Sequence, residues 1–179
     1  MKYANILRSF CFAGCLVASG TLFAQSDSQT LLFNIPEIKL LALPNVTIDL
    51  SMSETDFALS ETGLSTSVVT KSDSSQYAFF TLAQGTALRI TGELDAALPA
   101  GMLLRAEMGS DGSSVGTPSP TSSGLQGVTS TSSIDLLTNI GNGVYSSATL
   151  TYELDYDVST LDLDSGGSST VTVVYTITL

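Results

Sequence analysis

The regular alternation of residues 170–179 constrains the fold more than any other feature of the sequence. One face of this stretch would carry Val171, Val173, Tyr175, Ile177 and Leu179, and the other face would be mostly threonine. Period-two alternation of β-branched and aromatic residues predicts a β-strand with one buried face. Such a strand has to pair with a neighbour and be covered by a second layer.

Most other apolar stretches alternate in the same way. Strands are predicted at residues 31–35, 46–52, 77–82, 88–94, 102–108 and 148–158. Short alternating strands separated by turn residues indicate antiparallel sheets, each with one solvent-facing side. We therefore expect an all-β fold, an Ig-like antiparallel β-sandwich of about eight short strands.

The connections between these strands give further expectations. Residues 72–75 are predicted to form a turn, and residues 99–101 the turn of a β-hairpin. Across that hairpin Arg89 or Arg105 would face Glu93 or Glu107. Residues 109–133, rich in Gly, Ser and Thr, are expected to form a long polar loop. In residues 134–140 an apolar side chain recurs at every third position, which favours a turn or two of helix.

Residues 1–24 have the pattern of a secretory signal peptide. Lys2 and Arg8 precede an uncharged apolar run that ends at Ala24. A retained membrane anchor is the alternative, although the run is shorter than the roughly 20 residues of a bilayer span. With cleavage, residues 25–179 would form a single domain with no membrane span, secreted to the periplasm, the exterior or the cell surface of a bacterium.

Charge and composition exclude several functions. Loss of Lys2 and Arg8 would leave four basic residues against 17 acidic ones, a formal charge of −13. That charge argues against binding to nucleic acid or to anionic membranes. The chain has no histidine, and its two cysteines lie within residues 1–24. Nucleophilic triads and zinc sites of the usual kind are thus excluded, and we expect no enzyme and no cofactor. A small hydrolase built on a carboxylate pair is the remaining catalytic alternative.

The densest acidic cluster offers one candidate metal site. Asp157, Asp162 and Asp164 are candidate Ca²⁺ ligands, because carboxylate oxygens at alternate positions before a glycine suit a hard cation. The alternative is that the acidic residues of 153–157 form only the solvated face of a strand. Similarly, Tyr152, Tyr156 and Tyr175 would either stack on a sugar or, by their alternation with Leu and Val, lie in the core.

Gly166 lies at the fourteenth position from the last residue, and alternating apolar residues follow it. In this pattern the chain resembles the pilin subunits of bacterial chaperone–usher fimbriae, which have a glycine at the same position. Thr178 occupies the position of the family's penultimate tyrosine. The resemblance implies that the final strand borders a groove that a neighbour's N-terminal extension fills. Leu31, Phe33 and Ile35 would be the donor residues, and Gly166, Val171, Val173, Tyr175, Ile177 and Leu179 the acceptor residues.

These patterns support two functional hypotheses besides the small hydrolase. The first is a secreted or cell-surface structural or adhesive protein, a fimbrial-like subunit that forms a homopolymer, or joins another surface protein, by strand addition. The second is a self-contained sandwich that binds a carbohydrate or Ca²⁺.

Overall fold

The computed structural model describes residues 36–44, 47–56, 59–60, 63–64, 67–83, 87–160 and 170–179. All of its elements belong to the unit Pro36–Leu179. The described residues do not include the predicted signal peptide of residues 1–24 or the donor candidates Leu31, Phe33 and Ile35. They also do not include the candidates Asp162, Asp164 and Gly166. The expectations for them therefore stay predictions.

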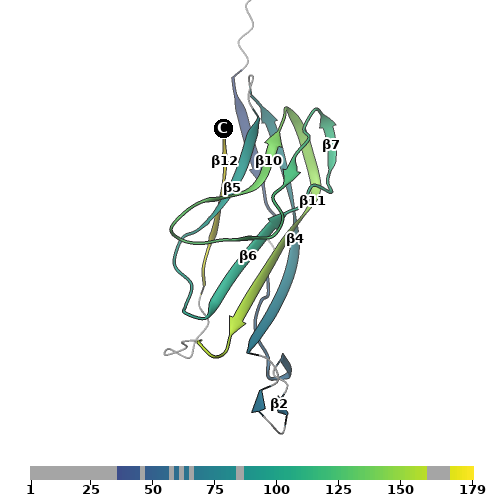
Figure 1. The fold of residues 1–179 in the computed structure, drawn as a ribbon. Helices are drawn as coiled ribbons and strands as arrows, with labels where there is room; N and C mark the ends of the chain where they lie inside the picture. Colours follow the sequence, from purple (N-terminus) through teal and green to yellow (C-terminus); the bar gives the residue numbers. More distant parts are fainter. Residues whose placement is uncertain are drawn as a thin grey trace, which may run out of the picture. The chain divides into compact units, whose positions relative to one another are not determined.

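The first sheet is built around two long paired strands, β4 (Val68–Leu82) and β11 (Gly143–Asp157). β1 (Ile38–Ala42) pairs with the outer edge of β4, and β6 (Met102–Met108) and β7 (Ser113–Gly116) both pair with β11. β9 (Gln126–Gly127) follows β6 at the far edge. All these pairs are antiparallel, and Figure 1 shows the strands side by side.

The second sheet has the order β12 (Val173–Thr178), β5 (Leu88–Leu94), β10 (Ile134–Ile140) and β8 (Thr121–Ser122). Its pairs are also antiparallel. A one-turn 3₁₀ helix, η1 (Glu54–Asp56), and a two-stranded ribbon of β2 (Leu59–Ser60) and β3 (Gly63–Leu64) lie between β1 and β4 in the chain.

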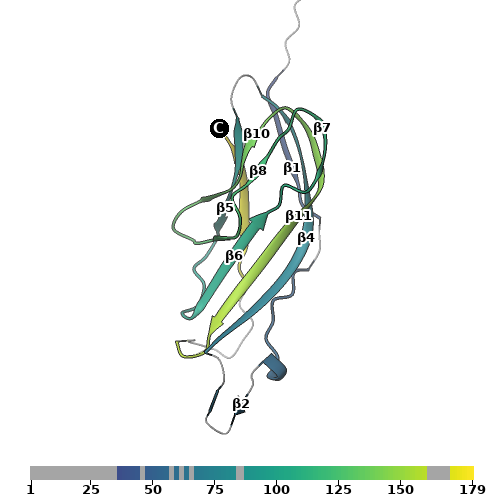
Figure 2. The same ribbon diagram turned by 45° about the vertical axis from the view of Figure 1, so that its right-hand side comes forward.

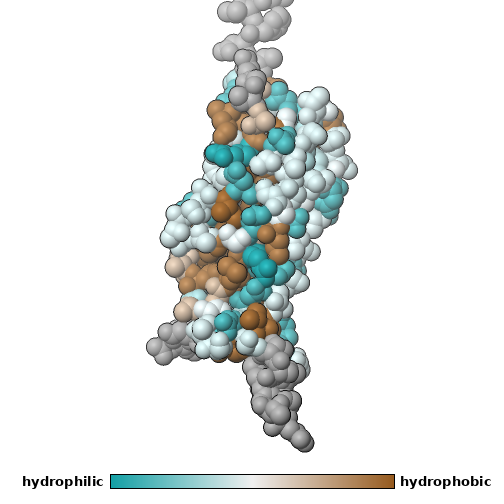
Figure 3. All heavy atoms as spheres, viewed as in Figure 1, coloured by the Kyte–Doolittle hydropathy of each residue, from teal (hydrophilic) through white to brown (hydrophobic). Residues whose placement is uncertain are grey.

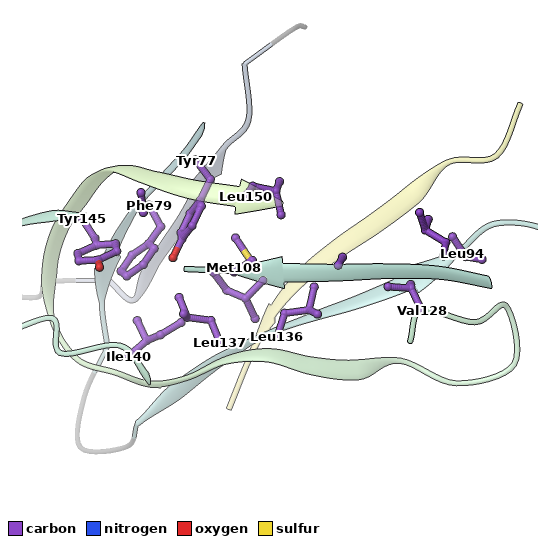
Figure 4. Packing of buried hydrophobic residues seen from close by; sticks show 14 of the residues in the cluster. Tyr77, Phe79, Leu94, Met108, Val128, Leu136, Leu137, Ile140, Tyr145 and Leu150 are labelled. Atoms are coloured by element: carbon purple, nitrogen blue, oxygen red, sulfur yellow. The ribbon is translucent and has the colours of Figure 1, made fainter. Parts of the chain in front are cut away.

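The hydrophobic core lies between the two sheets, as Figure 4 shows. Tyr77, Phe79 and Tyr145 pack from the first sheet, with the rings of Phe79 and Tyr145 stacked at 5.2 Å. Leu137 and Ile140 of β10 pack from the second sheet and are fully buried. The expected all-β, antiparallel β-sandwich is confirmed.

Two of the predicted local structures are wrong. Residues 72–75 form no turn but the middle of β4, because Ser72 to Ser75 pair residue by residue with Glu153 to Leu150 of β11. Residues 134–140 form strand β10 and not a helix. The irregular apolar spacing of β10 reflects two register shifts in its pairing with β5, and Asn139 within it has a φ of 56°.

The predicted hairpin between residues 88–94 and 102–108 is also wrong. β5 belongs to the second sheet and β6 to the first, so residues 95–101 cross between the sheets. The expected charge pairs change accordingly. Arg89 lies 3.4 Å from Asp135. Arg105 contacts Glu153 at 2.8 Å and also binds Asp155, both on β11.

Of the two remaining expectations, the first is wrong and the second holds in part. Residues 47–53 lie in no strand, although alternation predicted one for residues 46–52. Residues 109–133 contain the short strands β7, β8 and β9, and Val128 within them is almost fully buried. This long connection therefore adds edge strands to both sheets.

Candidate functional site: the acceptor edge at β12

Strand β12 forms one edge of the second sheet. Its ladder with β5 runs from Val173 opposite Leu94 to Thr178 opposite Arg89. Within the described residues β12 forms no ladder on its other side. An edge strand of this kind presents backbone donors and acceptors to any further strand. We call β12, together with the apolar side chains Val171, Val173, Tyr175 and Ile177, the acceptor edge.

The inward face of the acceptor edge is apolar and only half-buried. Leu88, Ile90 and Leu94 of the neighbouring β5 are at most 3% exposed. The four apolar side chains of the acceptor edge touch the same core but none is fully buried. Their placement on one face confirms the alternation expected for them, whereas Leu179 is 62% exposed. The burial of the core thus decreases sharply from β5 to β12.

Across from the acceptor edge lies the edge of the first sheet. β1 and β12 touch each other but do not pair. Leu41 of β1, with Leu50 and Met52 of the following segment, is partly buried against the core on this side. The two strands can be followed in Figure 2, and Figure 3 shows that apolar residues on one face of the molecule are interrupted by hydrophilic ones. The two sheets therefore leave apolar side chains partly uncovered between their edges.

A pair of tyrosine hydroxyls joins the two sheets at this place. The Tyr175 hydroxyl on β12 donates a hydrogen bond of 2.7 Å to the Tyr152 hydroxyl on β11. Burial raises the pKa of the Tyr175 phenol well above its ordinary value, and the nearby Tyr152 adds to this effect. Burial also raises the pKa of the Tyr152 phenol. Both groups are thus held neutral as a hydrogen-bonding pair.

The segment 47–56 covers the first half of β4 by polar contacts. The Asp49 amide donates to an Asp73 carboxylate oxygen at 2.9 Å, and the Lys71 ammonium lies 2.5 Å from Asp56. The Tyr156 hydroxyl donates to the Leu50 carbonyl at 2.7 Å. The hydrogen bond from Lys71 is the main cause that lowers the pKa of Asp56. Lys71 and Asp73 face inward here, which is why alternation did not reveal this half of the strand.

Of the other candidate residues, the structure describes Asp157 and the three tyrosines. Asp157 accepts hydrogen bonds from the amide and hydroxyl of Ser159 at 3.0 and 2.6 Å, and these bonds lower the pKa of its carboxyl. No group of three metal-binding side chains occurs in the described part of the chain. Tyr156 is 6% exposed, and Tyr152 and Tyr175 pack against the core, so the three tyrosines form no open stacking surface.

The sequence pattern predicted that Val173, Tyr175 and Ile177 share one face of a strand, but not what lies opposite them. Tyr152 was grouped with the core tyrosines, and nothing in its spacing shows that its hydroxyl meets that of Tyr175. Leu41 lies in a dense apolar run without alternation. The sequence shows polar residues, Lys71 and Asp73, at the inward positions of β4. They become interpretable only when the contacts of these side chains with residues 49 and 56 are known.

The fold and its edge define an antiparallel β-sandwich with a half-covered edge strand. No helix among the described residues is long and apolar enough to cross a bilayer. Comparison with models of protein families finds no match, and searches of curated proteins and of solved structures find none either.

Proposed function

We propose that this chain is a secreted or cell-surface structural subunit that accepts a β-strand from another molecule at the acceptor edge, as the resemblance to fimbrial subunits implies. The observation that carries the proposal is the half-buried apolar face of an edge strand, Val173, Tyr175 and Ile177, beside the fully buried face of β5. The structural or adhesive role rests on strand addition, and the proposal assigns the chain no catalytic reaction.

An added strand would complete both kinds of interaction that β12 lacks. Its backbone would pair with the open side of β12, and its side chains would cover Val173, Tyr175 and Ile177. Burying an apolar side chain fully is worth about 1.5–3 kcal/mol, so covering three half-buried ones is worth on the order of 3 kcal/mol. Backbone pairing along β12 would add to this gain and would fix the register of the added strand.

The proposed donor is the segment around Leu31, Phe33 and Ile35, whose alternation matches a strand with one apolar face. This segment leads directly into β1. The start of β1 and the end of β12 lie at the same end of the sandwich, because Ile38 pairs with Leu82 at the end of β4 and Thr178 with Arg89 at the start of β5. The donor segment of one copy would therefore begin at the end of the sandwich where β12 ends, and it would pair with β12 of a second copy.

The test uses the full exported chain and a synthetic peptide of residues 28–36. We expect the peptide to raise the melting temperature in a saturable manner, because a ligand that binds only the folded state stabilises it. A peptide carrying Phe33→Ser is the control and should have a smaller effect. The matched chain variants are Val173→Thr, which changes the inward face, and Val174→Thr, which changes the 48% exposed outward face.

Loss of the effect in Val173→Thr with retention in Val174→Thr would support strand addition. The absence of any shift with the wild-type chain would refute an accessible acceptor edge, and would favour a sandwich that is complete within one molecule. An equal shift in both variants would place the peptide elsewhere on the protein.

A further inference from the structure

The outward face of the first sheet carries an apolar row that crosses four strands. The cross-strand register places Leu40 of β1 opposite Phe80 of β4, Phe80 opposite Val144 of β11, and Val144 opposite Val115 of β7. Leu40 is 59% exposed, Val144 41% and Val115 73%, while Phe80 is half-buried between its neighbours. Exposed apolar side chains that are contiguous, unlike singly scattered ones, form a candidate interaction surface.

Two further rows flank this middle row on the same face. On one side lie the large residues Ile38 and Leu82, which pair with each other. On the other side lie the small residues Ala42 and Ala78, followed across the sheet by the paired Ser146 and Ser113. We define the outer patch as Ile38, Leu40, Ala42, Ala78, Phe80, Leu82, Val115 and Val144. It is separate from the acceptor edge, which faces the space between the sheets.

Charge is distributed unevenly over this outward face. Its other end, beyond the small row, holds Glu153 and Asp155, paired with Arg105. The eight residues of the outer patch are all uncharged, although the chain has a formal charge of −11. A second acidic copy would therefore meet less repulsion at the outer patch than at the charged end of this face.

The size of the outer patch limits the strength of any contact. Strands lie about 5 Å apart and rise about 3.4 Å per residue, so the patch measures about 15 by 14 Å. Two such surfaces would bury roughly 500 Å² in total, against about 1,200 Å² for a small stable complex. The contact is thus too small to hold a permanent dimer and suits weak, reversible pairing, which becomes strong only where it repeats along an assembly.

We propose that the outer patch binds the outer patch of a second copy of this chain, around a two-fold axis that runs along the middle row. This axis places the large row of Ile38 and Leu82 over the small row of Ala42 and Ala78 in the other copy. It also directs the two acidic ends away from each other. The alternative axis, parallel to the strands, would stack the acidic ends and oppose large residues with large ones.

The geometry makes a specific cross-linking prediction. With the axis along the middle row, Val115 faces Val115 of the second copy, and Leu40 faces Leu40. Packed sheets lie about 10 Å apart, too far for a disulfide, so a short bis-maleimide reagent is needed. The experiment uses the full exported chain, and Cys11 and Cys15 are changed to Ser where residues 1–24 are retained, so that no native cysteine is present. Single variants Val115→Cys, Leu40→Cys and Leu103→Cys are compared near millimolar concentration.

Val115→Cys and Leu40→Cys should each cross-link into dimers about tenfold faster than Leu103→Cys, because pairing raises the effective concentration of the facing thiols. Leu103 is the matched control, since it is a 46% exposed leucine at the charged end. Equal rates in all three variants would overturn the proposal. Preferred linkage of Leu40→Cys to Val115→Cys in a mixture would overturn the proposed axis.

A second measurement separates this contact from strand addition. Sedimentation equilibrium of the full chain should show reversible dimerisation that disappears in Val115→Glu and persists in Val173→Thr. Association that survives Val115→Glu but not Val173→Thr would refute the role of the outer patch while supporting the acceptor edge. A chain that stays monomeric near millimolar concentration would refute pairing through the outer patch. Strand addition is judged separately by the peptide test, which does not depend on self-association.

Discussion

Removal of the hydroxyl of Tyr175 tests whether the two sheets are joined at the acceptor edge. The Tyr175→Phe variant keeps the ring against the core but deletes the 2.7 Å hydrogen bond to the Tyr152 hydroxyl. A hydrogen bond between neutral groups contributes about 1 kcal/mol net, since water replaces part of what is lost. The two tyrosines are half-buried, so this average value applies rather than the larger cost of an orphaned, fully buried group.

We therefore expect Tyr175→Phe to lower the free energy of unfolding by about 1 kcal/mol. For a domain of this size the melting temperature would fall by about 3 °C. Urea unfolding of the wild type, Tyr175→Phe, Tyr152→Phe and the double variant completes a thermodynamic cycle. The second hydroxyl should contribute little once the first is absent, which gives a coupling energy of about 1 kcal/mol.

A coupling energy within about 0.3 kcal/mol of zero would refute the reasoning, because distant independent sites add to within that margin. It would mean that the hydroxyls do not meet in solution and that β12 is held to the sandwich by β5 alone. The m-value of each variant should match that of the wild type, which shows that the same surface is exposed on unfolding.

Three further predictions concern the core of the sandwich. Leu137→Ala, at a fully buried position, should destabilise the protein by about 3 kcal/mol in urea unfolding, and a loss below about 1 kcal/mol would contradict its place in the core. Gly92→Ala should cost about 1–3 kcal/mol, because the new Cβ would lie 2.7 Å from Cδ1 of the buried Leu136. Gly127→Ala is its control, with a nearest atom at 3.8 Å, and an equal loss in both would refute the packing argument. Burial raises the pKa of the Tyr77 and Tyr175 phenols above their unfolded values, so their contribution is complete below about pH 10 and is lost as the pH rises further. Unfolding free energies from pH 8 to 11.5, with tyrosinate absorbance, should therefore show a decline only above about pH 10.

Alternation alone predicted the strands whose two faces meet different surroundings. β5, β6 and β12 each have one face on the core and one on solvent, so period-two patterning placed them correctly. The same patterning predicted that Val173, Tyr175 and Ile177 lie on the core face of β12. The residue type at each position of these strands reflects whether that position is buried, more than which strand it pairs with. The strands can therefore be predicted from local sequence.

The remaining structure depends on partners far along the chain. The first half of β4 directs Lys71 and Asp73 inward, and only the polar contacts of residues 47–56 make that arrangement stable. β10 departs from alternation because its pairing with β5 shifts twice. The expected hairpin of residues 88–108 failed because a turn of Pro, Ala and Gly also fits a crossing between two sheets. The alternation pattern of a single sequence does not report which strands pair, where their register shifts, or which sheet a strand joins.

The pairing of β4 with β11 has a consequence for how fast the sandwich forms. The nearest partners in this ladder, Thr81 and Gly143, are 62 residues apart, and Val68 and Asp157 are 89 apart. β12 likewise pairs with a strand more than 70 residues earlier. Closing loops of this length costs entropy before any contact compensates for it. Refolding from denaturant should therefore be slow, in the range of milliseconds to seconds, with both central strands formed in one late cooperative step.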